Sequence, residues 1–430
     1  MSLFNWQEKP TSALANEGVI APDERLPWPQ TTAMGVQHVI AMFGATVLAP
    51  ILMGFDPNLA IFMSGVGTLI FYFITGGKVP SYLGSSFAFI GVVIAATGYA
   101  GQGPNAHIPV ALGAILVCGL LYTLIGAVVQ AIGTGWIERL MPPVVTGAVV
   151  AVIGLNLAAI PVKNMAASNF DSWMQLATFV SVALVAVFAR GMVQRLLILV
   201  GLAIATLIYV LLANGLGLGL GKPMDFSGIA NAAWVGLPRF TAPEFSGNAM
   251  LLIAPVALIL VAENLGHLKA VAAMTGRNLD PYIGRAFTAD GVATMISGAA
   301  GGTGVTTYAE NIGVMAATRI YSTAVFVVAA LMALVLGFSP KFGALIQAIP
   351  LPVMGGVSIV VFGLITIAGA RIWVDNKVDF GDPANLLTAA ITLILGTGDF
   401  TLKFGSFALG GIGTATFGAV LLHALLRRRA

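Results

Sequence analysis

The sequence predicts an all-α polytopic membrane protein with about fourteen transmembrane segments, arranged as two inverted repeats of seven. Three observations predict this fold. Of the 430 residues, 58% are hydrophobic and only 9% are charged, whereas a soluble domain carries about 25% charged residues. Apolar runs of roughly 17–25 residues, each long enough to cross a bilayer core, recur along the whole chain. Two pairs of similar short segments are also separated by the same number of spans, which points to an internal repeat.

The predicted spans follow one another along the chain, and two of them are unusual. The third and tenth are too short to cross as full helices, and each lies beside a Gly/Ser/Thr-rich stretch, LGSSF or GGTGVTTY, that favours extended chain. Non-helical backbone at membrane depth is tolerated only where it is buried in protein or lines a cavity. We therefore expect two discontinuous elements that meet at a site. The predicted spans are 33–53, 58–76, 87–99, 108–132, 142–161, 173–189, 194–213, 248–267, 284–300, 308–318, 320–338, 349–369, 384–398 and 407–425.

The distribution of basic residues predicts the orientation in the membrane. If the N-terminus is cytoplasmic, fifteen of the 20 Lys and Arg residues lie in inner segments. This bias follows the positive-inside rule and requires an even number of spans. We therefore expect a multi-pass protein of the bacterial cytoplasmic (inner) membrane with both termini in the cytoplasm, residues 1–30 forming a short polar tail. The five basic residues expected outside are Lys163, Lys222, Arg239, Lys341 and Lys403.

Internal similarity predicts how the two halves are related. PVVTGAVVAVIGL (143–155) aligns without a gap to PVMGGVSIVVFGL (352–364), and SSFAFIGV (85–92) aligns with one gap to TTYAENIGV (306–314). Both pairs are seven spans apart. Because seven is odd, the halves must run in opposite directions across the membrane. This is the inverted-repeat plan of secondary transporters, whose substrates bind near the midplane where broken helices meet.

Two carboxylates in apolar segments indicate where that site lies. Glu263 belongs to LLIAPVALILVAENLGHL (251–268), and Glu310 belongs to GVTTYAENIGVMAATR (304–319). An ionisable group at membrane depth costs roughly 2.5–3.5 kcal/mol on insertion scales and usually faces a cavity or an ion path. The alternative is that each acid only forms a hydrogen bond to a neighbouring helix. A binding centre for a proton or a ligand explains both acids better.

Histidines near these acids extend the candidate centre. His267 follows Glu263 by four residues and shares its helix face, so the pair can hold or relay a proton. His38 lies in the first span, where a satisfied buried histidine and a site residue are equally good interpretations. Asp290 is expected near the inner end of the ninth span, where an interfacial or helix-start role is favoured and a coupling role is the alternative. No metal-binding spacing joins these groups, so neither a metal nor another cofactor is expected.

The stretch VTTYAEN (305–311) places a small residue between an aromatic ring and a carboxylate. If this segment is extended, its backbone N–H groups are available to a ligand. Carboxylates accept from N–H donors, backbone amides donate to carbonyl groups, and aromatic faces stack on flat rings. Together they favour a planar heterocycle with both N–H and C=O groups. A bare anion is disfavoured, because no Lys or Arg lies at comparable depth.

At these residues the sequence resembles the nucleobase–ascorbate transporter family (nucleobase:cation symporter-2), and within it the bacterial uracil and pyrimidine permeases. The family signature, an acid or amide followed by N-x-G-x4-T and a basic residue, is present as Glu310, Asn311, Gly313, Thr318 and Arg319. The segments 37–50, 80–90, 262–268 and 349–358 also resemble that group. The resemblance extends from about residue 30 to the C-terminus.

This resemblance implies both the domain organisation and the site. A core domain would comprise 31–132 and 248–338, and a gate domain 133–213 and 339–426, with an outer loop at 214–247 and a cytoplasmic C-terminus at 427–430. Glu263 and Glu310 would hold the base, with His267 completing the proton-coupling network. The other residues implied for the substrate site are Phe87, Tyr308, Ala309, Ala45 and Phe362, with His38 and Asn311 as further candidates.

The resemblance also implies a substrate and an energy source. Family members that take purines commonly have Gln at the position of Glu310, so Glu favours a pyrimidine, uracil first of all, imported with a proton down the proton gradient. Ala309 replaces a Gly and Phe362 replaces a Tyr of the uracil permeases, which makes the pocket smaller and less polar. A purine (xanthine or urate) permease and an uncoupled facilitator are the alternatives. The expected partners are the base, the proton and the lipid bilayer, without nucleic acid, and a homodimer is compatible with the resemblance.

Overall fold

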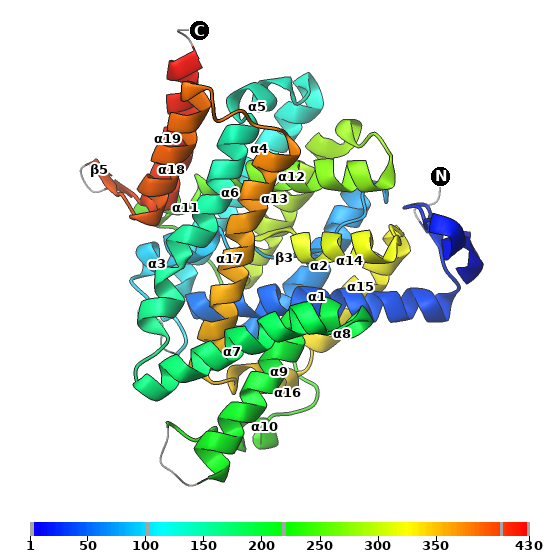
Figure 1. Ribbon diagram of the computed structural model, residues 1–430, viewed down its shortest axis with the longest axis vertical. Coiled ribbons are helices and arrows are strands. Elements are labelled where there is room, and N and C mark those ends of the chain that lie inside the picture. The colour runs from blue at the N-terminus through cyan, green and yellow to red at the C-terminus, as the bar shows by residue number, and fades with distance from the viewer. Residues whose placement is uncertain (1–3, 100–102, 217–220, 405–406, 428–430) are drawn as a thin grey trace.

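The computed structural model describes residues 4–99, 103–216, 221–404 and 407–427, and within them the chain is mostly helical (Figure 1). Each of the fourteen predicted spans corresponds to a helix, the eighth to two helices that meet at Pro255. These helices are α1 (Trp28–Met53), α2 (Pro57–Ile74), α3 (Phe89–Thr97), α4 (Ile108–Ile132), α6 (Pro143–Leu157), α7 (Asn169–Phe188), α9 (Leu197–Val210), α11 (Gly247–Ile253), α12 (Val256–Thr275), α13 (Ile283–Ala300), α14 (Ala309–Thr318), α15 (Thr323–Gly337), α17 (Leu351–Asp375), α18 (Pro383–Thr397) and α19 (Gly411–Arg427).

The remaining elements are short and lie between these helices or in the N-terminal tail. The short helices are α5 (Gly135–Leu140), α8 (Gly191–Arg195), α10 (Ser227–Asn231) and α16 (Pro340–Gln347), with single turns η1 (Thr11–Glu17), η2 (Ile160–Asn164), η3 (Leu211–Gly215) and η4 (Asp280–Tyr282). The strands form three separate pairs: β1 (Gln7–Glu8) with β2 (Glu24–Arg25), β3 (Leu83–Ser85) with β4 (Val305–Thr307), and β5 (Leu402–Phe404) with β6 (Phe407–Leu409).

Eight helical segments of the described chain are long and apolar enough to cross a membrane. The number is nine if α15 and α16, which meet at a bend of 83°, form one span. Helices α3, α13, α14, α18 and α19 occupy the other predicted spans without meeting that measure. The structure thus confirms a helical, multi-pass membrane fold, and the count of fourteen crossings stays a prediction.

Local sequence explains where several helices begin. Asp56 precedes Pro57, and its carboxylate accepts a hydrogen bond from the backbone N–H of Asn58. The same arrangement starts α18, where Asp382 precedes Pro383 and accepts from Ala384. An acidic N-cap satisfies one unpaired N–H, while proline at the first helical position has none to satisfy.

Helix packing follows the inverted repeat. The repeat pairs α2 with α13, α4 with α15, α6 with α17, α7 with α18 and α9 with α19. Exchanging each helix for its mate converts the contact between α4 and α13 into the one between α15 and α2, and both are extensive. The same exchange converts α7–α17 into α18–α6, and α7–α9 into α18–α19, all of which are observed. The two halves are therefore built on one plan.

Three features differ from the sequence-based expectation. The predicted fourteenth span starts at 407, but α19 begins at Gly411 because residues 407–409 pair with β5. Helix α12 continues to Thr275, beyond the predicted end at 267. The tail 1–30, of which 4–30 is described, is folded onto the protein through β1, β2 and a bridge between Ile20 and Ile320. Of the predicted C-terminus 427–430, the residues after Arg427 lie outside the described chain.

Candidate substrate-binding site

Two broken elements form the centre of the candidate site. Strand β3 leads into the short helix α3, and strand β4 leads into the short helix α14. The strands pair antiparallel, with Leu83 opposite Thr307 and Ser85 opposite Val305. Both short helices begin beside the strand pair, and the first amides of α3 are already bonded locally, from Phe89 to the carbonyl oxygen of Ser86 (3.4 Å) and from Ile90 to that of Phe87 (3.1 Å). The two discontinuous elements expected from the sequence are therefore present, and they meet.

Glycines allow the two elements to approach each other closely. A Cβ atom at Gly84 would overlap the Tyr308 ring, and one at Gly304 would overlap the Phe89 ring. Tyr308 fills the first of these positions because its hydroxyl group donates to the carbonyl oxygen of Ser85 (2.9 Å) and accepts from Thr46 (3.1 Å). Each half thus supplies a glycine that accommodates an aromatic ring of the other half.

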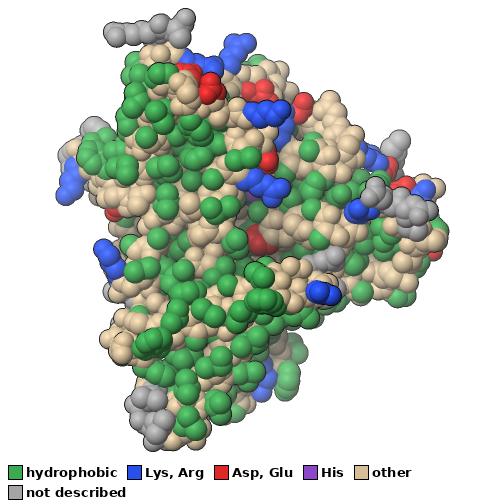
Figure 2. Space-filling view, in the orientation of Figure 1, with side chains coloured by type: hydrophobic (Ala, Val, Ile, Leu, Met, Phe, Trp, Pro, Cys, Tyr) green, Lys and Arg blue, Asp and Glu red, His purple; other side chains and the backbone are tan. Residues whose placement is uncertain are grey.

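The two acids flank this strand pair. Glu263 lies in the middle of α12 and Glu310 in the first turn of α14; both are half-buried, and their charges are close enough to interact. The Oε2 atom of Glu263 is buried without a hydrogen-bond partner in the described chain. Figure 2 shows an acidic side chain at the bottom of a hollow between α17 and α14. Neither acid is fully enclosed, and Glu263 has bonding capacity left for a ligand.

A chain of hydrogen bonds leads away from the acids into the core. His267 Nδ1 lies 2.8 Å from Thr307 Oγ1, which donates to Asn264 Oδ1 at 3.4 Å. Because Thr307 has a single hydroxyl proton, this leaves His267 Nδ1 as the donor in the first contact. Asn264 in turn donates to the hydroxyl oxygen of Tyr122 (2.9 Å) and to Asp290. His267 is thus fixed by β4 and connected to a second buried acid.

His38 and Asn311 form a separate contact between α1 and α14. The Asn311 amide donates to Nδ1 of His38 (2.9 Å) and to its carbonyl oxygen (3.0 Å), and the His38 ring packs on Phe326 with centroids 4.6 Å apart. Both residues are fully buried. They hold α14 against α1, and Asn311 is buried in this contact whereas the neighbouring Glu310 is only half-buried.

Apolar residues complete the surroundings. Phe87, just before α3, meets Phe362 of α17 edge to face, with ring centroids 5.9 Å apart. Ala45 of α1 is buried, whereas Ala309, the first residue of α14, is exposed. The structure thus places the predicted residues around one strand pair, with Ala309 open to the hollow.

Some residues of this site were not identified from the sequence, and one was misplaced. Asn264 and Thr307 carry the hydrogen-bond chain, and a polar residue directly after Glu263 and a threonine before Tyr308 were the available signals. Asp290 was expected at the inner end of its span, but it lies inside α13 and is fully buried. That expectation was wrong because Asp290 lies two turns into α13, where its carboxylate accepts a hydrogen bond from Asn264 of α12.

A hollow of about 980 Å³ between α1, α9, α15 and α16 contains none of these residues. Its lining is apolar except for Thr206. Within a membrane such a surface suits lipid chains, so we do not assign it to the substrate.

Solved structures with a similar fold are membrane transporters. The transmembrane domain of the cyanobacterial bicarbonate transporter BicA superposes with a TM-score of 0.63 at 16% identity, covering 86% of this chain and 96% of that one. Murine Slc26a9 in its inward-facing state gives 0.67 at 11% identity, covering 94% and 68%. A second SLC26A9 structure gives 0.60 at 12% identity, and this chain spans 64% of its length. At these identities the likeness shows the fold alone. The fold and the broken elements define a polytopic membrane protein built on an inverted repeat.

Sequence comparisons establish the family. A profile described as "Permease family" matches residues 29–404. The chain is 68% identical over 432 aligned residues to the Escherichia coli (strain K12) protein named "Putative pyrimidine permease RutG", covering 100% of this chain and 97% of that protein. It is 42% identical to a uracil permease of Paenibacillus larvae subsp. larvae (94% and 96% covered) and 39% identical to a uracil permease of Escherichia coli (strain K12) (95% and 94%). The chain belongs to the nucleobase–ascorbate transporter family of permeases.

Proposed function

We propose that the protein imports a pyrimidine nucleobase, uracil first of all, across the bacterial cytoplasmic membrane by proton symport. The observation that carries this proposal is the pair of half-buried acids, Glu263 and Glu310, beside two helix N-termini at the crossing of the broken elements. The names of the relatives, a pyrimidine permease and several uracil permeases, support the substrate class.

The chemistry of the site fits a neutral ring with N–H and C=O groups. The carboxylates of Glu263 and Glu310 accept from ring N–H groups, and the backbone amides of Phe87 and Ala309, at the starts of the two short helices, donate to ring oxygens. Phe87 and Tyr308 provide aromatic surface beside them. Neither acid forms an ion pair within the described residues, so the site lacks the cation that a bare anion would need. Ala309 and Phe362 keep the pocket small and apolar, which suits a single six-membered ring.

Proton coupling follows from the two acids being close together at membrane depth. A charged carboxylate is costly there, and two adjacent negative charges repel each other. Binding a proton removes one charge, so the loaded site that crosses the membrane holds a neutral base and one proton more than the empty site. Glu263, His267 and Glu310 form the proposed coupling network. Both chain termini are proposed to face the cytoplasm.

Uptake of labelled uracil, thymine and xanthine by cells that lack their own carriers tests this proposal. Uracil uptake should rise as the external pH falls and collapse when a protonophore is added. Accumulation against a gradient that survives the protonophore would contradict symport. Uptake that only equilibrates the base would identify a facilitator, and a preference for xanthine would identify a purine permease. Reporter fusions at both ends test the orientation.

A further inference from the structure

The N-terminal tail forms a compact unit before the first helix begins. Strands β1 and β2 pair in parallel, with Gln7 opposite Glu24. The pairing is reinforced by ion pairs between Lys9 and Glu24 (3.3 Å) and between Arg25 and Glu8 (2.7 Å). The Arg25 guanidinium also lies over the Trp28 ring at the start of α1, 4.5 Å from its centroid. We call residues 4–26 the strap.

The strap is fixed to the chain immediately after α14. The backbone N–H of Ile20 donates to the carbonyl oxygen of Arg319 (3.0 Å), and that of Tyr321 donates back to Ile20 (2.8 Å). Ile20 is fully buried in a small cluster with Leu26, Ile320 and Val325. Since Arg319 is the left-handed residue that ends α14 (φ 58°), the strap holds the end of this helix.

A second set of bonds joins the strap to the start of α15. The Thr323 hydroxyl group donates to the carbonyl oxygen of Pro22 (2.8 Å) and accepts from the Trp6 indole (2.9 Å). The backbone N–H of Thr323 donates to the same Pro22 oxygen (3.1 Å). The turn between α14 and α15 is therefore bonded to the strap both where α14 ends and where α15 begins.

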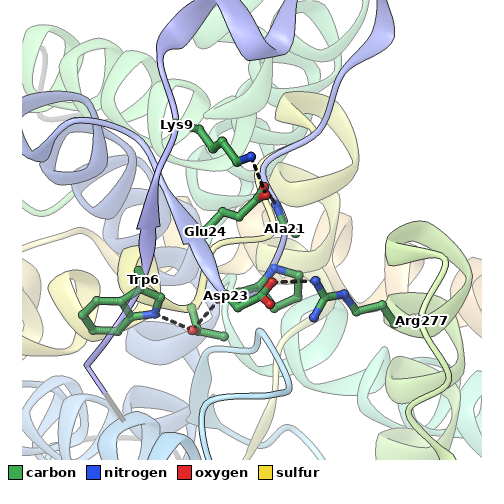
Figure 3. A network of polar contacts seen from close by, with 8 residues as sticks. Trp6, Lys9, Ala21, Asp23, Glu24 and Arg277 are labelled. Carbon is green, nitrogen blue, oxygen red and sulfur yellow. Dashed lines mark hydrogen bonds and ion pairs between the residues drawn. The ribbon is translucent and has the colours of Figure 1, made fainter. Parts of the chain in front are cut away.

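A third contact reaches the connection that follows α12. Figure 3 shows the Asp23 carboxylate facing the Arg277 guanidinium, with the two joined at 2.5 Å. Burial opposes ionisation of Asp23, but the hydrogen bond and the charge of Arg277 outweigh it, so the pKa of this carboxyl lies below its usual range. Arg277 lies two residues beyond the last residue of α12.

These contacts connect the two helices that carry the acids. Helix α12 holds Glu263 and helix α14 holds Glu310, and the strap bonds to the chain just beyond the end of each. The N-terminal end of α14 is fixed by the pairing of β3 with β4. The strap fixes its C-terminal end, and the direction of the helix axis depends on both attachments. Phe4 also packs on Tyr72 and Phe73 of α2, with centroids 5.8 and 6.0 Å apart, which anchors the strap to a helix outside the site.

We propose that the strap positions the substrate site: Ile20 and Asp23 are positioning residues that set the distance between Glu263 and Glu310 without touching the substrate. The consequence for binding rests on the proposed function, whereas the consequence for α14 does not. Replacing Ile20 by Ala removes buried contacts at the end of α14, and Asp23→Asn removes the charge that Arg277 faces. A matched control is Lys9→Gln, which breaks an ion pair inside the strap and leaves the contacts to α14 and α12 intact.

Hydrogen exchange on the purified full-length proteins tests the mechanical part. In Ile20→Ala the amides of 309–318 should exchange about tenfold faster than in wild type, because local opening needs less free energy. Lys9→Gln should leave them unchanged, and α7 and α18 should be unaffected in both variants. Exchange in 309–318 that is equally slow in wild type and Ile20→Ala would overturn the proposal.

Equilibrium binding of labelled uracil to the same proteins tests the positioning. Ile20→Ala should raise the Kd about tenfold, and Asp23→Asn about two- to fivefold, as expected for a partly exposed ion pair. The exchanged pair Asp23→Arg with Arg277→Asp should restore most of the affinity lost in Asp23→Asn. An unchanged Kd in a variant whose α14 exchanges faster would overturn the positioning role. If the wild type itself does not bind uracil, the proposed substrate is wrong, while the exchange data still decide whether the strap holds α14.

Discussion

The two broken elements share a backbone plan but differ in their chemistry. Both consist of a three-residue strand followed by a short helix, and each is packed on a glycine of the other half. Helix α3 is apolar up to its last residue, Thr97, and its first two residues are buried. Helix α14 carries Glu310 and Asn311 in its first turn and exposes Ala309 and Gly313 along one side. The repeat supplies the same strand and helix in both halves, and only α14 adds a charge.

The C-terminal ends of α3 and α14 also differ in the contacts that hold them. The last residue of α3, Thr97, accepts a hydrogen bond from Asn105 (3.0 Å), whose amide also donates to Met53 at the end of α1 (3.0 Å). That link is local to the first half. The end of α14 is held by the strap, a segment about 300 residues away in the sequence. We interpret the stronger attachment as a requirement of the helix that carries the acid.

The largest expected effect comes from removing the charges on α12 and α14. Glu310→Gln keeps the shape of the side chain but replaces an acceptor with an N–H donor, so a pyrimidine N–H loses its partner at a half-buried site. A hydrogen bond to a charged group is worth roughly 1.5–3 kcal/mol, which weakens binding about ten- to a hundredfold. Glu263→Gln should act likewise, and transport by either variant should fall to background because the proton site is lost.

Measuring both the uracil affinity and the melting temperature of the purified variants separates a binding role of the two acids from a purely structural role. Acids that only stabilise the fold would give lower melting temperatures with normal affinity in the folded fraction. Wild-type uracil affinity in a well-folded double variant would remove both residues from the binding site and, with them, the functional assignment.

The second prediction tests the shared plan. Gly84→Ala and Gly304→Ala each introduce a methyl group that overlaps an aromatic ring of the other half. Overpacking of this kind costs typically about 1–3 kcal/mol. Both variants should therefore melt at lower temperature by similar amounts, and Gly313→Ala, where a Cβ meets nothing within 4 Å, is the matched control. A much larger loss for one of the two glycines would show that the halves are not mechanically equivalent.

The third prediction concerns the contribution of the first half to binding. Phe87→Leu keeps an apolar side chain but removes the aromatic surface that is proposed to lie beside the base, and aromatic contacts are worth about 0.5–1.5 kcal/mol. Uracil affinity should fall about two- to tenfold, less than in Glu310→Gln. Calorimetry on both variants provides the comparison. A loss as large as that of Glu310→Gln would mean that α3 contributes more than packing.

Sequence reasoning predicted the helical fold and the broken elements because hydrophobicity, glycine content and length are local properties of the chain. It selected Glu263, Glu310 and His267 because charge is rare in apolar segments. It did not predict the chain from His267 through Thr307 and Asn264 to Asp290, since threonine and asparagine are common in such helices and only the packing of α12 against α13 and β4 brings them together.

The strap was beyond sequence reasoning for a related reason. Residues 1–30 are polar, and polarity gives no information about contacts between segments 300 residues apart. Ile20 has no helical or strand periodicity around it, and Asp23 and Arg277 become partners only after α12 and α14 are placed. Long-range backbone bonds such as Ile20 to Arg319 have no signature in a single sequence.

The smallest expected effect is the pH dependence of the attachment just beyond the end of α12, where Asp23 faces Arg277. Because the folded-state pKa of Asp23 lies below the ordinary value of 3.8, the stability it contributes is present above that ordinary pKa. It is lost as the pH falls through the folded-state pKa.

For a partly exposed ion pair the contribution is at most about 1 kcal/mol. The melting temperature of wild type should therefore exceed that of Asp23→Asn by a small, constant amount near neutral pH, and the two should converge as the pH falls below the folded-state pKa of Asp23. Asn105→Ala removes the corresponding link at α3, which contains no titrating group, so its difference from wild type should not change with pH over the same range. A difference for Asp23→Asn that persists unchanged at acidic pH would show that the charge of Asp23 does not hold the strap.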